Sequence, residues 1–235
     1  MRQKILTIDI GTQSVRVAIV TAEGKILKLS QILQEVHSPH SGWAQQKPDS
    51  WWEKAVGAIR EVFFDSRIRP DSIKAISVCG QMHGPVGIDE TGNITTEWVQ
   101  LWCDKRCSKQ CDAIRQKYDE ARLAEITANP INTAWTAFKV LWIKNNQRNL
   151  YDKSRWFLAP KDFINYRLTG VAATDYSEAS GSYLFDARTE KYCLDLAEKL
   201  GVDIEKFPPI SNSYDLIGNI TNEAAQKTGL EPGTP

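Results

Sequence analysis

The chain has 235 residues, in which 29 Lys and Arg balance 29 Asp and Glu, and 42% of the residues are hydrophobic. A chain of this length and composition can bury a core without disulfide or metal support, which argues against a mainly disordered protein. The balanced charge argues against a nucleic-acid partner, and no apolar run approaches the roughly 18 residues of a membrane span. The five cysteines are an odd number without an export signal, so we expect reduced thiols and a cytoplasmic location.

The first 36 residues predict three strands of an antiparallel meander. Residues 4–10 form an apolar run, residues 14–21 place Val or Ile at every second position, and residues 25–36 continue as a third strand. Turn residues separate these strands at Gly11–Gln13 and Ala22–Gly24.

A helix and a further strand follow the meander. Pro48 and Asp49 suit the first turn of a helix, where proline fits the backbone and an acid faces the positive end of the dipole. The helix then carries one apolar stripe, formed by Trp52, Val56, Ile59 and Phe63. The apolar run at residues 73–79 predicts a strand buried on both faces, ending in the loop Gly80–Gly84. A hairpin is expected to start at Pro85 and to return with a strand from Ile94.

The remaining sequence is mainly helical in its pattern. Helices are predicted over residues 104–127, around 135–142, and over 161–168, 189–200 and 221–228, with short strands at 156–158 and 216–220. A strand meander followed by helix, strand and further helices indicates an α/β domain with a mixed sheet. We therefore expect the region 104–200 to be a helical elaboration on that domain.

The first candidate site is Asp9 followed by Gly11, Thr12, Gln13 and Ser14. A glycine in such a turn lets backbone N–H groups approach an anion closely, and the carboxylate could hold a hydrated magnesium ion. The same residue types are ordinary in a hairpin turn, so on local grounds both interpretations stay open.

The second candidate is the loop Gly80–Gly84, which follows an apolar strand. Ligands in open α/β sheets bind beyond the carboxyl ends of such strands. Gln81 and His83 can each donate and accept hydrogen bonds, which suits a polyol or a sugar. A loop whose histidine caps backbone groups is an equally good interpretation of these residues.

The third candidate is the segment Trp102–Arg106, in which an indole, a carboxylate and a guanidinium could line a sugar site. The alternative is a helix start with Asp104 as its N-cap. Cys103, Cys107 and Cys111 are spaced four residues apart, which matches no common zinc pattern.

Together these segments resemble the FGGY family of carbohydrate kinases, and within it the xylulokinase-like branch. The resemblance runs along nearly the whole chain and depends on the order of many short matches. They are Ile8–Thr12, Trp51–Trp52, Gly80–Gly84, the Trp-x-Asp-x-Arg of Trp102, Asp104 and Arg106, Lys139–Trp142, Leu158–Phe163, Leu168–Gly170 and Thr174–Asp186.

The resemblance implies a ribonuclease-H-like domain of the actin/hexokinase type, one of two that close over a cleft, and transfer of the γ-phosphoryl group of ATP to a sugar hydroxyl. It implies that Asp9 acts in catalysis near the phosphates by holding Mg²⁺ through water. It also implies a phosphate-binding turn and a sugar-binding set. These are Gly11, Thr12, Gln13 and Ser14 for the phosphates, and Gln81, Met82, His83 and Asp104 for the sugar, for which a ketopentose such as xylulose is expected.

The sequence departs from the family pattern in one respect. Family members are longer, and their catalytic-base aspartate lies in a Gly-Gly-Asp-like segment that occurs nowhere in these residues. We therefore expect residues 1–235 to be the N-terminal, sugar-binding domain of a kinase, with the base and the ATP-binding domain beyond Pro235 and with no activity alone. Cys103, where the branch usually has Asn, leaves the sugar open.

Other forms and other functions stay open at this stage. The resemblance allows a homodimer of the complete protein. A stand-alone sugar-binding or regulatory module with this fold is the alternative function. An ATPase of the chaperone or actin type shares the Asp-x-Gly-Thr turn, but the Gln81–His83 loop and the Trp102–Arg106 segment argue against it.

Overall fold

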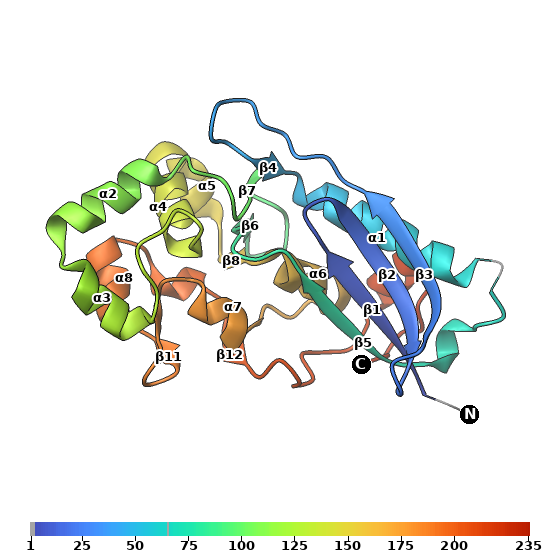
Figure 1. Ribbon diagram of the computed structural model, residues 1–235. Helices are drawn as coiled ribbons and strands as arrows, with labels where there is room; N and C mark the ends of the chain where they lie inside the picture. The colour runs from blue at the N-terminus through green and yellow to red at the C-terminus, as the bar shows by residue number, and fades with distance from the viewer. Residues whose placement is uncertain (1–2, 65) are drawn as a thin grey trace.

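The computed structural model describes residues 3–64 and 66–235. Its main sheet has four strands in the order β3-β2-β1-β5 (Figure 1). They are β1 (Lys4–Ile10), β2 (Ser14–Thr21), β3 (Ile26–Leu33) and β5 (Ile73–Gly80). The first three strands pair antiparallel, and β5 pairs parallel to β1. The predicted meander and mixed sheet are confirmed, although β3 is shorter than the expected strand over 25–36.

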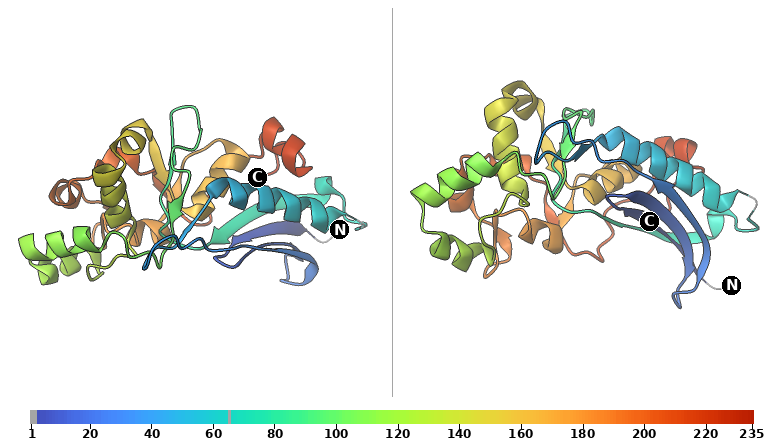
Figure 2. Two further views of the ribbon diagram at one scale, coloured as in Figure 1. Left: turned by 90° about the horizontal axis from the view of Figure 1, so that it is seen from above. Right: turned by 45° about the horizontal axis from the view of Figure 1, so that its top comes forward.

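Helix α1 (Pro48–Phe63) makes the crossover from the meander to β5 and packs on one face of the sheet (Figures 1 and 2). Its inner side chains include Trp51, Ala55, Ile59 and Val62, each 0% exposed. Their spacing of three or four residues follows one face of the helix, and their burial is the main reason that it forms here.

Two shorter helices pack beside α1. They are α6 (Pro160–Thr169) and α9 (Asn222–Thr228), and each ends at a glycine in the left-handed region, Gly170 (φ 75°) and Gly229 (φ 78°). Glycine has no Cβ and adopts this conformation without steric strain, so it commonly ends a helix. Both predicted helix ends are confirmed to within a residue.

Strand β5 differs from the prediction of a strand buried on both faces. Ile73 is buried, but Lys74, Ser77 and Cys79 are exposed. The reason is its position: β5 is the outermost strand, and within the described residues α1 and α6 pack against one face of the sheet only. On the outer edge of β5, the backbone N–H of Ile76 donates to the carbonyl of Pro235 at 2.8 Å.

Small strand pairs connect the sheet to the rest of the molecule. They are β4 (Gln45–Gln46) with β7 (Val99–Gln100), and β6 (Val86–Ile88) with β8 (Trp156–Leu158). The hairpin predicted from Pro85 to Ile94 is present: Ile88 and Ile94 form an antiparallel bridge, and the N–H groups of Asp89 and Thr95 donate to the carbonyls of Asn93 and Gly87 at 2.9 and 2.8 Å. The returning segment is too short to be a strand, and β6 also pairs with the distant β8.

Most of the remaining elements form a second region, at the other end of the molecule in Figure 1. Its helices are α2 (Ser108–Lys117), α3 (Glu120–Thr127), α4 (Thr136–Asn146), α5 (Arg148–Lys153), α7 (Tyr176–Ser180) and α8 (Leu194–Leu200), with a 3-10 turn, η2 (Ile204–Lys206). Its strand pairs are β9 (Thr174–Asp175) with β12 (Ile210–Ser211) and β10 (Phe185–Asp186) with β11 (Lys191–Tyr192). A second 3-10 turn, η1 (Pro70–Ser72), belongs to the sheet region and leads directly into β5.

Three predicted elements of this region are corrected. The helix over 104–127 is two helices, because Asp119 leaves the helical conformation and accepts a hydrogen bond from the Ala121 N–H as the N-cap of α3. The helix over 189–200 begins only at Leu194, since its first residues form β11. Residues 216–220 form no strand, and the short strand lies earlier, at β12.

Two hydrophobic cores result. The first joins α1, α6 and the sheet, and the second joins α2, α3, α4 and α8. Strand β8 contributes to both, because Leu158 belongs to the first core and its neighbour Phe157 to the second. Among the helices that the structure describes, none is long and apolar enough to cross a membrane.

Candidate functional site

The carboxyl ends of β1 and β5 lie side by side, because the two strands run parallel with Ile10 opposite Gly80. A Cβ on Gly80 would lie only 2.8 Å from the carbonyl oxygen of Ile10, so the close approach requires glycine. The N–H of Gln81 donates to that same carbonyl at 2.7 Å. The turn after β1 and the loop after β5 therefore start next to each other.

The carbonyl groups of the turn Gly11–Gln13 all accept hydrogen bonds from two glutamines. The carbonyl of Gly11 accepts from the Gln34 side chain at 2.6 Å, that of Thr12 from the Gln46 side chain at 2.9 Å, and that of Gln13 from the Gln34 N–H at 2.8 Å. Within residues 3–64 and 66–235, the N–H groups of Thr12 and Gln13 donate no hydrogen bond. Free, adjacent N–H groups are what an anion such as phosphate binds.

A chain of side-chain hydrogen bonds joins this turn to the loop after β5. The hydroxyl of Thr12 donates to Gln81 Oε1 at 3.0 Å and accepts from Trp102 Nε1 at 3.2 Å. Gln81 Nε2 donates to Gln46 Oε1 at 2.9 Å, which also accepts from Trp51 Nε1 at 3.0 Å. The predicted phosphate turn and the predicted sugar loop are thus one connected unit.

Asp9 lies at the edge of this unit with its side chain 37% exposed. Its Oδ2 is 3.2 Å from Arg16 Nη1, and burial together with the neighbouring Asp9 raises the pKa of the Cys79 thiol. An exposed carboxylate beside a turn with free N–H groups fits a hydrated magnesium ion, which prefers oxygen ligands and keeps most of its water. The hydroxyl of Ser14 is buried and has no hydrogen-bond partner among the residues that the structure describes.

The side chains of the sugar-loop residues Met82 and His83 differ in exposure. The Met82 side chain is exposed, as is that of Trp102. The His83 residue is only 5% exposed and has a backbone φ of 66°. Its N–H donates to Glu178 Oε1 at 2.6 Å, and its ring meets that of Trp135 edge-on with centroids 5.1 Å apart.

Asp104 is fully buried, and its carboxylate is occupied by protein groups. It accepts from the Ala44 N–H at 2.7 Å and from the Arg106 guanidinium at 2.7 to 3.0 Å. The guanidinium carbon lies 3.7 Å from the centre of the Trp43 ring and 5.2 Å from that of Trp142. Asp104 therefore fixes the segment that carries Trp102, and the structure does not place it on the exposed surface.

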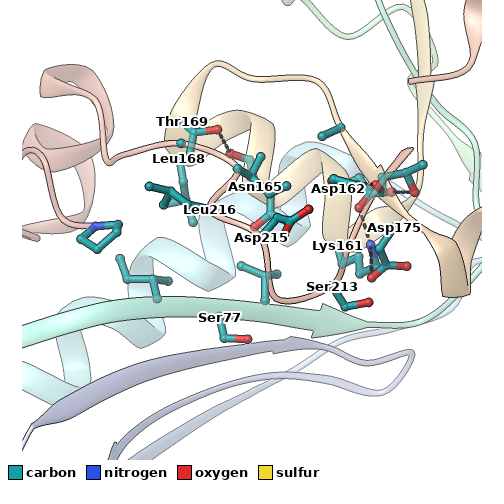
Figure 3. Close-up of a pocket in the computed structure, with 18 of the residues that line it drawn as sticks. Ser77, Lys161, Asp162, Asn165, Leu168, Thr169, Asp175, Ser213, Asp215 and Leu216 are labelled. Atoms are coloured by element: carbon teal, nitrogen blue, oxygen red, sulfur yellow. Dashed lines mark hydrogen bonds and ion pairs between the residues drawn. The ribbon is translucent and has the colours of Figure 1, made fainter. Parts of the chain in front are cut away.

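A small cavity of about 130 Å³ lies between β5, α6 and residues 211–220 (Figure 3). Lys161 and Asp162 form a buried ion pair there, and Lys161 Nζ also lies 3.4 Å from Asp175 Oδ2. Burial raises the pKa of Asp162 to about 6, against the opposing effect of Lys161. Because Asp175 is the N-cap of α7, these charges support the helix that presents Glu178 to His83.

Gln34, Gln46 and Glu178 contact the candidate site residues but were not singled out by the sequence. Glu178 lies inside the block Thr174–Asp186, which the family resemblance had marked. Nothing in the sequence of that block indicated a contact with His83. Gln34 and Gln46 carry no local signal, because only the folded chain brings them to the turn.

An antiparallel meander, a helical crossover and a parallel strand define an α/β domain of the ribonuclease-H-like, actin/hexokinase type, as the resemblance implied. The chain belongs to the FGGY family of carbohydrate kinases, because residues 4–235 match the N-terminal domain of that family.

Individual relatives agree with this assignment. The chain is 31% identical over 226 residues to the xylulose kinase of Bacillus subtilis (strain 168), covering 96% of this chain and 45% of the relative. It superposes on the crystal structure of xylulose kinase from Rhodospirillum rubrum with a TM-score of 0.92 and 25% identity, covering 99% of this chain and 47% of that one.

It also shares the fold of gluconate kinase from Lactobacillus acidophilus, with a TM-score of 0.90 and 21% identity over 100% of this chain and 47% of that one. The chain spans about half the length of the curated relatives it matches.

Proposed function

We propose that the complete protein transfers the γ-phosphoryl group of ATP to a sugar hydroxyl, and that this chain is its sugar-binding domain. The observation that carries the proposal is the hydrogen-bonded contact between the Gly11–Gln13 turn and the loop after β5, through Thr12 and Gln81. A phosphoryl donor and its acceptor must lie close together and in line, since this reaction depends mainly on positioning and charge stabilisation.

Each part of the unit has a task in this proposal. The free N–H groups of Thr12 and Gln13 hold a phosphate, and Asp9 holds Mg²⁺ through water. The ion supplies charge neutralisation for the phosphoryl group. Met82 and Trp102 offer apolar surface to the carbon side of a sugar, and His83 offers a ring nitrogen to a hydroxyl. Because no Gly-Gly-Asp segment occurs in the sequence, we propose that the catalytic base lies beyond Pro235.

For the substrate we propose a ketopentose such as xylulose. The support is that the relatives with 31% and 29% identity are xylulose kinases. We also propose a cytoplasmic location, an ATP-binding domain that follows this one, and a homodimer as one form of the complete protein.

The test is a panel of sugars and polyols, including xylulose, gluconate and glycerol, assayed for ATP consumption and for binding by calorimetry. We expect the complete protein to phosphorylate a ketopentose with the highest kcat/KM, and the 235-residue chain alone to show no turnover. Sugar binding without turnover by the complete protein would contradict the kinase proposal and favour a binding or regulatory module. Turnover by the 235-residue chain would show that the base lies within it.

A further inference from the structure

The backbone of His83 has an unusual conformation, and its N–H bonds to a carboxylate. Its φ of 66° lies in the left-handed region, which residues other than glycine rarely adopt. The N–H of His83 donates to Glu178 Oε1 at 2.6 Å, across 95 residues of sequence. Both side chains are nearly buried, with exposed fractions of 7% for His83 and 12% for Glu178. A charged acceptor in such surroundings forms a stronger hydrogen bond than a neutral one.

The imidazole ring of His83 faces the same carboxylate. Its Nδ1 lies 3.5 Å from Glu178 Oε1, and this nitrogen is buried without a hydrogen-bond partner among the described residues. The ring lies against Gly181, where an added Cβ would be 2.1 Å from the ring carbon Cε1. With Trp135 edge-on on another side, the ring has little freedom to turn.

We infer that Glu178 is a positioning residue that keeps the proton of neutral His83 on Nδ1, so that Nε2 accepts a hydrogen bond from a substrate hydroxyl. The inference rests on the proposed function, since it names how the sugar loop recognises its ligand. A carboxylate close to one imidazole nitrogen favours the proton at that nitrogen and leaves the other as the acceptor.

The position of Glu178 is fixed by a hydrogen bond and by neighbouring ion pairs. Asp175 Oδ1 accepts from the backbone N–H of Glu178 at 2.9 Å as the N-cap of α7, and Lys161 lies between Asp175 and Asp162. Figure 3 shows this group of charges beside the cavity. The buried ion pairs therefore fix α7 on α6, and α7 fixes the carboxylate toward His83.

The experiment compares Glu178→Gln with the wild type in the complete protein. Glutamine keeps an oxygen for the His83 N–H but removes the charge that favours a proton at Nδ1. We expect the KM for the sugar to rise roughly tenfold, with kcat changed much less, because the lost hydrogen bond serves the ground state and the transition state alike. Glu125→Gln, which changes an exposed glutamate in α3, is the matched control and is expected to leave both constants unchanged.

Two further measurements separate a positioning role from a merely structural one. In a His83→Ala background, Glu178→Gln is expected to cause no further rise in KM, because it acts through His83. Nitrogen NMR of labelled histidine is expected to show His83 protonated at Nδ1 in the wild type and shifted toward the Nε2-protonated form in Glu178→Gln. Gly181→Ala, which displaces the ring from the other side, is expected to raise KM as His83→Ala does.

Additive effects of the two substitutions, or a His83 ring protonated at Nε2 in the wild type, would overturn the inference. If the complete protein phosphorylates no sugar, the proposed function fails, and the NMR measurement still decides the role of Glu178. If the wild type is active and Glu178→Gln has an unchanged KM, the inference fails and the proposed function stands.

Discussion

Replacing Asp104 with Asn is expected to destabilise the folded chain by about 3–5 kcal/mol, the usual cost of breaking a buried ion pair by removing one charge. Both partners are almost completely enclosed, with side-chain exposed fractions of 0% for Asp104 and 4% for Arg106. The carboxylate accepts four hydrogen bonds from the guanidinium and backbone N–H of Arg106, and one more from the Ala44 N–H. An asparagine keeps one acceptor oxygen and turns an N–H₂ group toward donors.

In Asp104→Asn, the guanidinium of Arg106 would lose its carboxylate partner and keep only its contacts with Gln45 and the Trp43 ring. Arg106 Nη2 also donates to Gln45 Oε1 at 2.6 Å, and the Trp43 ring lies 3.7 Å from its charged carbon. Each of these contacts contributes about 1 kcal/mol, which is less than the desolvation of a buried charge.

Urea-induced unfolding of the 235-residue chain, followed by tryptophan fluorescence and circular dichroism, measures the change directly. The matched control is Asp152→Asn, which breaks the pair with Arg148 on the surface, where the two side chains are 52% and 64% exposed. That pair is expected to contribute less than about 0.5 kcal/mol. A loss below about 1 kcal/mol in Asp104→Asn would refute the reasoning and leave Asp104 free to serve as a direct sugar contact.

Three further predictions concern the site and the cores. In the complete protein, Asp9→Asn is expected to lower kcat by roughly 10- to 100-fold at saturating magnesium, with sugar affinity by calorimetry retained, because the carboxylate serves the metal; an unchanged kcat would make Asp9 a turn residue. Gly80→Ala is expected to cost about 1–3 kcal/mol in urea unfolding, because the new Cβ would lie 2.8 Å from the carbonyl of Ile10, and full stability would show that β5 can move. Burial lowers the pKa of Lys139 from 10.5 to about 8, so between these values the unfolded chain holds a proton that the folded chain has released. Stability relative to Lys139→Met is therefore expected to rise with pH across this window, by at most about 1.4 kcal/mol per pH unit, and a flat difference would contradict the buried charge.

The parts of the fold that were predictable are those encoded locally. The meander follows from alternating Val and Ile around two tight turns, the start of α1 from Pro48, and the ends of α6 and α9 from Gly170 and Gly229. The two-residue strands β4, β7, β9 and β12 were not predictable, because each pairs through only two residues with a segment far away in the sequence. Strands β10 and β11 form a short local hairpin, and the sequence pattern assigned the residues of β11 to a helix.

The candidate site was predictable as two loops but not as one unit. Gly11–Gln13 and Gln81–His83 each have a sequence pattern, but only the parallel register of β1 and β5 brings them together. Asp104 shows the limit of this reasoning. Its motif marks it for the sugar site, but whether a carboxylate faces a ligand or a buried guanidinium depends on the packing of Trp43 and Trp142, which no local pattern contains.

Strand β8 has a consequence for the cooperativity of unfolding. Its adjacent residues Phe157 and Leu158 are buried in two different cores. If either core unfolds, the three-residue strand loses the packing on one of its two faces. The two cores should therefore not melt independently, and amide hydrogens on both sides should exchange in a common opening reaction. A substitution that weakens β8 would separate this opening into two transitions, so this three-residue strand also determines whether the domain unfolds as a single two-state unit.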